Sequence, residues 1–404
     1  MNNIYILDEY KSSTQNGIGT FLRELIKCLA GHNICLIEFN SNEKEFTLKT
    51  NNDFREIHFP VFLRNGFLDN YKIIDKFLRL YIEDSADNLF MLNHSPCEKL
   101  LKTIKVAFPL SKVTFTIHDL GWTSRLLGDF ELLKTIISKE THKKIQLKYK
   151  HVIDYFREEQ RMYEAADRVI CLSDDTFRFL QEVYLLDKNK ISLIPNGLSD
   201  TRAITSTAVK KRLKIKMGIH PNEKILLVIG RTTSVKGVPS LLNAFSNVIK
   251  KYPDSRLVIV GQVHDSQLLL KLSKRFAAKF TYTGLIDKEE LSRWYRIADI
   301  GVIPSFSEQC SYTGIEMMMH GLPVVASDGF GVRSMFQNGI NAQVATIGNR
   351  KKTKEFEKNL TTAILELLLS EMLRKKISNG SRQVYESYYN SEKMRERYKK
   401  LLEE

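Results

Sequence analysis

The chain has 404 residues, 43% hydrophobic and 27% charged, the composition of an ordinary globular protein with length for two or three domains. No apolar run approaches the ~18–20 residues that cross a bilayer, the start MNNIYILDEYKSS is unlike a signal peptide, and five scattered cysteines favour a reduced, cytoplasmic compartment. The net charge of +14 leaves nucleic acid, an anionic membrane face or a phosphate-rich substrate as partners, and no nucleic-acid-binding signature is present.

The first half of the chain alternates apolar strand candidates with helical stretches, which predicts a mainly parallel sheet covered by helices. A polar, irregular segment at 199–223 then reads as an interdomain hinge. The strand candidates are NIYILD (3–8), NICLIEF (33–39), EIHFPVF (56–62), LFMLN (89–93), KVTFTIHD (112–119) and VICLS (169–173), with a helix expected at 20–30.

One segment of this half, residues 139–169, is strongly basic and is expected to form a long helix. A helix packed on the sheet with a solvated lysine face is the commoner arrangement. The alternative is a helix that lies on an anionic bilayer surface. The apolar face is formed by Ile145, Leu147, Val152, Ile153 and Phe156, and beside it stand Lys143, Lys144, Lys148 and Lys150.

The strand and helix pattern restarts after the hinge, so a second doubly wound unit is expected. Two such units facing one another would hold a ligand between them. A long helix is expected at 353–371 and a last one from Ser391. The strand candidates are KILLVIG (224–230), SRLVIVG (255–261), FTYTG (280–284), IGVIPS (300–305), LPVVAS (322–327) and NAQVAT (341–346).

Two cations follow the first strand of the second half. Arg231 and Lys236 lie between the end of KILLVIG and the next helix, which is where open α/β sheets gather ligands. A guanidinium fork and a compact ammonium suit a diphosphate leaving group, and Gly237 lets the backbone turn closely into the helix. Two ordinary surface cations are a weaker explanation, because the positive end of a helix dipole disfavours them.

Two carboxylates follow a later strand. Glu308 and Glu316, separated by seven residues, flank a helix start expected near Tyr312, whose free N–H groups suit a phosphate. Carboxylates cannot favour that anion, so they are better explained as acceptors for hydroxyls on either side of it, one on a ribose and one on a sugar. Phosphate between two polyols describes a nucleotide sugar. Without the other loop, the two glutamates would be explained as solvated charges at a helix start, which the helix dipole favours.

In this order the motifs resemble the family-four retaining glycosyltransferases of the GT-B fold, also called group 1. One departure is Gln309-Cys310-Ser311-Tyr312, where the family often has a stretch like Gly-Phe-Gly. The quoted motifs span most of the chain, and their order makes an accident improbable. They are NGIGT (16–20), TIHDL (116–120), VICLSDDT (169–176), SLIPNGLSD (192–200), GR-x4-KG (230–237), YTGLIDKEEL (282–291) and Glu-x7-Glu-MMMHGLPVVAS (308–327).

The resemblance implies two facing Rossmann-like domains. Residues 1–200 would form the acceptor domain, joined by a C-terminal helix in 388–404 that crosses back, and residues 201–387 the donor domain. His118, at the end of KVTFTIH, would orient the transferred sugar, with an earlier histidine, His94, as a weaker candidate for acceptor binding. The donor would be bound at its diphosphate by Arg231 and Lys236, at its base by Leu285 and Ile286, at its sugar by Glu308 and at its ribose by Glu316. The other donor-binding residues would be Gly17 and Gly19 in the first βα loop and Ser311, Tyr312 and Thr313 at the helix start.

The implied activity is that of a metal-independent hexosyltransferase that retains the anomeric configuration, with no cofactor and a UDP- or GDP-sugar as donor. No Asp-x-Asp pair occurs to hold a metal on the diphosphate. Glycan, lipid-linked and protein or peptide acceptors all stay open, as does peripheral contact with the inner face of an anionic membrane. The alternatives are a non-hydrolysing sugar-nucleotide epimerase and a donor-binding partner subunit on the same fold.

Overall fold

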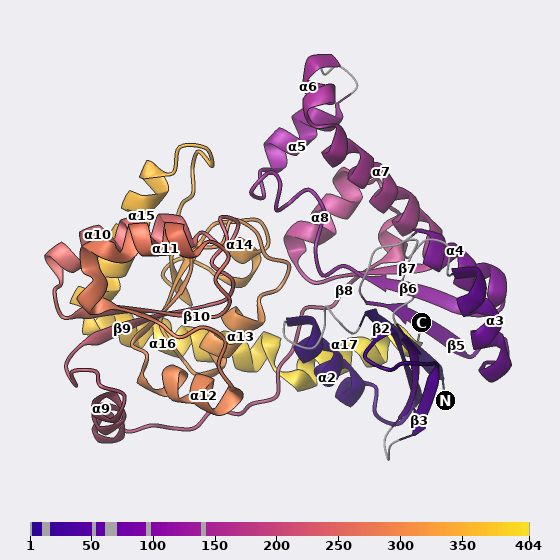
Figure 1. The fold of residues 1–404 in the computed structure, drawn as a ribbon, viewed down its shortest axis with the longest axis horizontal. Helices are drawn as coiled ribbons and strands as arrows, with labels where there is room; N and C mark the ends of the chain where they lie inside the picture. Colours follow the sequence, from indigo (N-terminus) through magenta and orange to yellow (C-terminus); the bar gives the residue numbers. More distant parts are fainter. Residues whose placement is uncertain are drawn as a thin grey trace. The chain divides into compact units, whose positions relative to one another are not determined.

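A computed structural model of the chain describes residues 2–9, 17–50, 54–60, 71–93, 98–138 and 143–403 (Figure 1). These residues form two compact α/β units, each with its own sheet. Unit 1 consists of Met1–Trp122, Glu131–Asn196 and Met394–Glu404, and unit 2 of Thr123–Phe130 and Gly197–Lys393.

The described residues of unit 1 form an eight-stranded sheet in the order β3-β4-β2-β1-β5-β6-β7-β8. Every neighbouring pair is parallel except β3 with β4. β5 is buried along its whole length, as expected of a parallel strand covered on both faces. The strands are β1 (Asn3–Glu9), β2 (Asn33–Ser41), β3 (Thr47–Thr50), β4 (Arg55–Pro60), β5 (Asn88–Leu92), β6 (Lys112–Thr116), β7 (Arg168–Cys171) and β8 (Ile191–Leu193).

Sequence reasoning missed β3, a short and mostly exposed strand with no apolar run to reveal it. The helix expected at 20–30 begins earlier, at Gly17, so Gly17 and Gly19 lie inside its first turn. The helices of unit 1 are α2 (Gly17–Cys28), α3 (Tyr71–Tyr81), α4 (Glu98–Ala107), α5 (Phe130–Ile137, its first residue grouped with unit 2), α6 (Lys143–Lys148), α7 (Lys150–Ala165), α8 (Asp174–Glu182) and the 3-10 turn η1 (Lys188–Lys190).

The described residues of unit 2 form a six-stranded, fully parallel sheet in the order β11-β10-β9-β12-β13-β14. The chain winds outward from β9 in one direction and then returns to start again at β12. The strand order therefore reverses between β9 and β12, and ligands bind at such a switch point in open α/β sheets. The strands are β9 (Lys224–Ile229), β10 (Ser255–Val260), β11 (Phe280–Tyr282), β12 (Ile300–Ile303), β13 (Val324–Ser327) and β14 (Ala342–Ala345).

The core of unit 2 packs α10 and α15 against this sheet through Phe245, Phe356 and Leu360, all fully buried. The predicted hinge at 199–223 was only partly right, because it contains the helix α9, capped by the Ser206 hydroxyl. The helices are α9 (Thr207–Lys216), α10 (Val238–Lys251), α11 (Ser266–Ser273), η2 (Lys274–Lys279), α12 (Lys288–Ile297), α13 (Tyr312–Met319), α14 (Val332–Met335), α15 (Lys354–Leu369), α16 (Glu371–Val384) and the π turn η3 (Tyr385–Tyr389).

The last helix, α17 (Ser391–Glu403), begins at the predicted Ser391. Its residues from Met394 onward group with unit 1, and its side chains Met394 and Tyr398 are buried. Among the helices of the described ranges, none is both long enough and apolar enough to cross a membrane.

Cys28, Cys35, Cys171 and Cys310 are buried, and Cys97 lies outside the described residues. Burial raises the pKa of the Cys35 thiol to about 11. The pKa of Cys171 is raised for the same reason. Both thiols therefore behave as core residues.

Gly237 generates a prediction about stability. It caps α10 in the left-handed region, at φ +67°, and a Cβ there would overlap the Pro304 carbonyl oxygen. Gly339 has a similar φ of +71° with nothing within 4 Å of the Cβ position. Gly339→Ala should cost about 1–2 kcal/mol for the backbone alone, and Gly237→Ala should cost clearly more. Urea unfolding of the two variants measures the difference, and equal losses would contradict the proposed packing.

Candidate functional site

The first predicted loop leaves the carboxyl end of β9. Gly230 and Gly261 end adjacent strands, and a Cβ on Gly261 would overlap the Gly230 carbonyl oxygen. The two strand ends therefore approach each other as only glycine permits. Beyond them Arg231 is exposed, and it makes no ion pair with any described residue. Its guanidinium is accessible to an anionic ligand.

Lys236 and Glu308 meet across the switch point. The Lys236 Nζ lies 2.6 Å from Glu308 Oε1, and the Ser305 hydroxyl donates to the same oxygen at 2.8 Å. Both side chains of the pair are partly exposed, at 26% and 12%. A half-buried pair of this kind keeps contact with solvent while holding two loops together. The two residues that the sequence assigned to a phosphate and to a sugar are thus brought into direct contact.

Backbone contacts fix the Glu308 loop. The Phe306 amide donates to Val235 in the first loop, and the Glu308 amide donates to Phe330, in the loop after β13. A Cβ on Gly331 would overlap the Glu308 carbonyl oxygen. Three loops at the carboxyl ends of β9, β12 and β13 therefore form one packed layer.

The predicted helix start is confirmed, since α13 begins at Tyr312. The Ser311 hydroxyl caps it by accepting from the Gly314 amide at 3.3 Å. Ser311, Tyr312 and Thr313 are all half-buried at this end. The N-terminus of α13 therefore begins four residues after Glu308, and the positive end of a helix dipole favours an anion.

Glu316 projects from α13 toward α12. Its Oε2 accepts a hydrogen bond from the Tyr295 hydroxyl at 2.5 Å. Burial raises the pKa of Glu316, and the Tyr295 hydrogen bond acts in the opposite direction. Sequence reasoning missed Tyr295, because nothing in WYRIAD marks a tyrosine that meets a carboxylate two elements later. Leu285 and Ile286 follow β11 as predicted, and the Leu285 side chain is 62% exposed.

The predicted residues of unit 1 need two corrections. Gly17 and Gly19 lie within α2 and not in a loop before it, because tertiary packing overrides weak helix propensity; Gly19 is buried there. His118 does not end a strand, since β6 stops at Thr116. The half-buried His118 ring instead packs edge-on against Phe21 of α2, with ring centroids 4.5 Å apart. His94 lies outside the described residues.

A buried carboxyl holds the loop that carries His118. Glu159 of α7 is 5% exposed. It accepts from the Gly121 amide at 2.7 Å and from the Tyr184 hydroxyl at 2.6 Å. Burial without a cationic partner raises its pKa to about 7. No motif in the sequence marked this residue.

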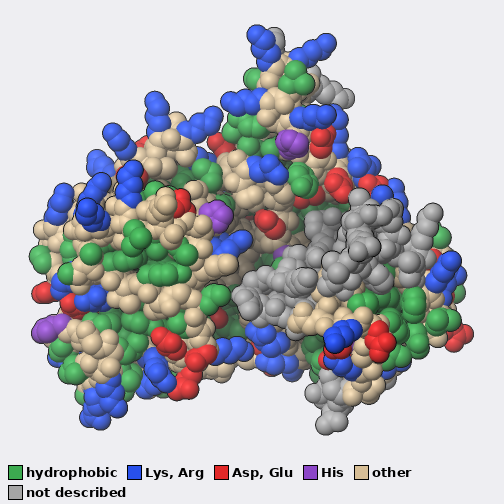
Figure 2. All heavy atoms as spheres, viewed as in Figure 1, with side chains coloured by type: hydrophobic (Ala, Val, Ile, Leu, Met, Phe, Trp, Pro, Cys, Tyr) green, Lys and Arg blue, Asp and Glu red, His purple; other side chains and the backbone are tan. Residues whose placement is uncertain are grey.

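The basic segment is two helices, and the predicted single helix was wrong. α6 and α7 meet at Tyr149. Val152 and Phe156 of α7 are buried, whereas α6 has no buried residue and exposes Leu147 at 73% and Ile145 at 38%. The predicted apolar face therefore divides into a packed part and an exposed part. α6 lies at the outer end of α7, away from the sheet of its unit, where Figure 2 shows lysine and arginine side chains gathered (Figures 1 and 2).

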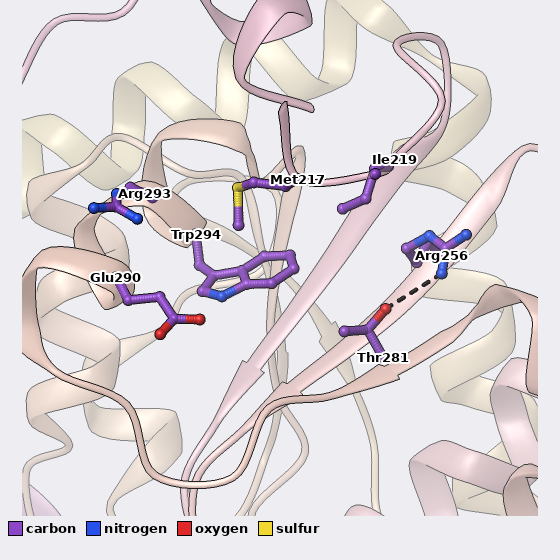
Figure 3. A pocket seen from close by; sticks show the side chains of 8 residues that line it. Met217, Ile219, Arg256, Thr281, Glu290, Arg293 and Trp294 are labelled. Atoms are coloured by element: carbon purple, nitrogen blue, oxygen red, sulfur yellow. Dashed lines mark hydrogen bonds between the residues drawn. The ribbon is translucent and has the colours of Figure 1, made fainter. Parts of the chain in front are cut away.

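A hollow of about 330 Å³ lies elsewhere in unit 2, around Trp294 of α12 (Figure 3). Arg256, near the start of β10, donates to the Thr281 hydroxyl at 3.2 Å on its wall. None of the predicted site residues lines it. Within the described ranges, no three His, Cys, Asp or Glu side chains are grouped to hold a metal ion.

Comparison with known families identifies the chain. Residues 15–202 match the family described as Glycosyltransferase Family 4, and residues 209–384 match Glycosyl transferases group 1. The chain belongs to these glycosyltransferase families. A relative, D-inositol 3-phosphate glycosyltransferase 2 of Catenulispora acidiphila, is 30% identical over 192 residues, which are 45% of this chain and 44% of the relative. The match thus spans less than half of that relative's length.

Solved glycosyltransferase structures share the architecture over nearly the whole chain. Sucrose-phosphate synthase from Thermosynechococcus elongatus superposes with a TM-score of 0.73 at 18% identity, covering 99% of this chain and 98% of that one. Anabaena HepE in complex with UDP gives 0.71 at 15% identity, covering 99% of each chain. The predicted GT-B fold of this chain is therefore confirmed.

The pKa of Glu159 predicts a pH dependence of stability. The pKa of Glu159 in the folded state, about 7, lies above the ordinary value of 4.5, so the folded state binds the proton more tightly. Protonation of Glu159 therefore contributes to the free energy of unfolding fully below pH ~4.5, and this contribution is lost as the pH rises toward 7. Relative to Glu159→Gln, the wild type should lose up to about 1.4 kcal/mol per pH unit in that window and then level off. Denaturant unfolding from pH 5 to 8 measures this, with exposed Glu158→Gln as the control. Parallel curves for wild type and Glu159→Gln would disprove it.

Proposed function

We propose that this chain is a metal-independent glycosyltransferase that transfers a sugar from a nucleoside-diphosphate donor with retention. The observation that carries the proposal is the contact between Lys236 and Glu308 at the switch point of unit 2. A cation for phosphate and a carboxylate for hydroxyls meet there beside the N-terminus of α13. Unit 2 would be the donor half and unit 1 the acceptor half.

The proposed roles follow from the chemistry of each group. Arg231, Lys236 and the helix start at Ser311, Tyr312 and Thr313 would neutralise the diphosphate as the glycosidic bond breaks. Glu308 would accept from the sugar hydroxyls and Glu316 from the ribose. The backbone at Leu285 and Ile286 would hold the base. In unit 1, His118 would orient the sugar, and Gly17 and Gly19 would let the start of α2 approach the donor.

The donor is proposed to be a UDP- or GDP-sugar. HepE was solved with UDP, which makes UDP the first ligand to test. For the acceptor, a glycan, a lipid-linked glycan and a protein or peptide are proposed alike. The C. acidiphila relative is named for a phosphorylated polyol, and the net charge of +14 suits a phosphate-bearing acceptor. A thermal-shift panel of UDP-, GDP- and ADP-sugars would identify the donor, because a ligand stabilises the state that binds it.

Two rival functions would give different products. A sugar-nucleotide epimerase converts the donor alone, and a donor-binding partner subunit gives no product with any acceptor. Incubation of the chain with nucleotide sugars, with and without acceptor, separates the three. NMR of the new glycosidic bond would then test retention, since an inverted anomer would contradict the proposal.

The leaving-group role predicts a kinetic signature. Arg231→Ala and Lys236→Ala should lower kcat more than donor affinity, because charge on the diphosphate grows toward the transition state. Lys250→Ala, which removes an exposed cation from the far end of α10, is the control. Lys236→Ala also leaves Glu308 without its cation, so the double variant with Glu308→Gln separates that effect. An unchanged kcat with only a raised KM would mean uniform binding and no such role.

A peripheral contact with an anionic membrane is also proposed, through the exposed lysines and apolar side chains of α6. Each lysine should contribute up to ~1 kcal/mol, weakened by salt. Co-sedimentation with anionic liposomes at low and high salt should therefore show weak, salt-sensitive binding. The test variant replaces Lys143, Lys144, Lys148 and Lys150 by Gln, and the charge-matched control replaces the exposed Lys211, Lys216, Lys250 and Lys251. Equal sedimentation of the two variants would assign the binding to net charge alone.

A further inference from the structure

Tyr295 of α12 is held at two points by a single helix. Its hydroxyl donates to Glu316 Oε2 at 2.5 Å. Its ring stacks on the His320 imidazole, with centroids 4.6 Å apart and planes 9° from parallel. Glu316 and His320 are four residues apart near the C-terminus of α13 and so lie on one face of it. α13 thereby fixes both the position and the rotation of the Tyr295 ring.

Burial fixes the protonation states in this cluster. Tyr295 is 4% exposed, and burial raises its pKa well above the ordinary value, so it stays a donor. Burial lowers the pKa of His320 to about 4, so the imidazole is neutral at pH 7 and stacks as an uncharged ring. In the hydrogen bond between the two residues, the Tyr295 hydroxyl donates to Glu316 Oε2.

The neighbouring residue on α12 anchors the helix from another side. Trp294 is 4% exposed and reaches into the hollow between Met217, Ile219 and Arg256 (Figure 3). Because adjacent residues on a helix point in different directions, Trp294 lies at the hollow while Tyr295 faces α13. The position of the Tyr295 hydroxyl is thus set by the fold before any ligand binds.

We propose that Tyr295 is a positioning residue that orients the Glu316 carboxylate toward the ribose hydroxyls of the donor, and that His320 keeps Tyr295 in place. This rests on the proposed function, in which Glu316 binds the ribose. With Oε2 held by the phenol, Oε1 makes no hydrogen bond to a described residue and is the oxygen that accepts from the nucleotide. A carboxylate fixed in this way need not lose rotamer freedom when the donor binds.

Calorimetry with UDP, 2′-deoxy-UDP and 3′-deoxy-UDP tests the proposal, with the GDP series used if UDP does not bind. Wild type should prefer the ribose form. Tyr295→Phe should weaken UDP binding about tenfold and narrow the preference over the deoxy forms, since a hydrogen bond to a charged group is lost. Tyr385→Phe is the control, because it removes another buried phenol, bonded to the Leu198 carbonyl at 2.9 Å.

Variants of His320 test the proposal independently, because they leave both partners of the Tyr295–Glu316 hydrogen bond unchanged. His320→Phe keeps a stacking ring and should retain the ribose preference, whereas His320→Ala should lose part of it. This pair carries the test if Tyr295→Phe does not fold, as judged by thermal unfolding beside Tyr385→Phe. Equal ribose preference in both histidine variants would overturn the role of His320.

Glu316→Ala separates failure of this inference from failure of the proposed function. If Glu316→Ala loses the ribose preference while Tyr295→Phe binds and discriminates like wild type, Tyr295 has no positioning role and Glu316 keeps its own. If Glu316→Ala discriminates like wild type, the ribose assignment of Glu316 is wrong, and the proposal for Tyr295 falls with it.

Discussion

The ion pair between Lys236 and Glu308 joins the two halves of the unit 2 sheet at the point where its strand order reverses. Lys236 follows β9 and Glu308 follows β12. These two strands are neighbours in the sheet, so the topology brings their loops together. The 2.6 Å contact then sets the spacing of the loops, and backbone hydrogen bonds to the loop after β13 extend the same layer. The proposed positions of diphosphate and sugar both depend on this geometry.

Glycine makes the layer possible. A methyl group on Gly237 would overlap the Pro304 carbonyl oxygen, and one on Gly331 would overlap the Glu308 carbonyl oxygen. The loop backbones therefore pack directly on one another. These glycines let the loops that carry Lys236 and Glu308 approach each other closely. The loop chemistry therefore depends as much on residues without side chains as on the charged ones.

Much of this could be predicted from the sequence, and the limits have physical reasons. Parallel strands buried on both faces, such as β9, are recognisable in the sequence as apolar runs. The charged residues that follow these runs indicate the loops. β3 is short and exposed and has no such signal. The break at Tyr149 and the start of α2 at Gly17 depend on packing, which single-residue propensities do not contain. Tyr295 and Glu159 act through partners far away in sequence, so no local pattern could reveal them.

Mutual neutralisation of Lys236 and Glu308 has a consequence for the order of events in turnover. Lys236 is already paired with Glu308 when a free anion approaches. Phosphate alone would therefore gain little binding free energy from Lys236. A nucleotide sugar can replace both partners at once, offering oxygens to the ammonium and hydroxyls to the carboxylate. In the proposed reaction the sugar leaves Glu308 on transfer, and the attraction between Glu308 and Lys236 would then compete with the remaining diphosphate. The pair would then act as an internal competitor that speeds departure of the spent nucleotide.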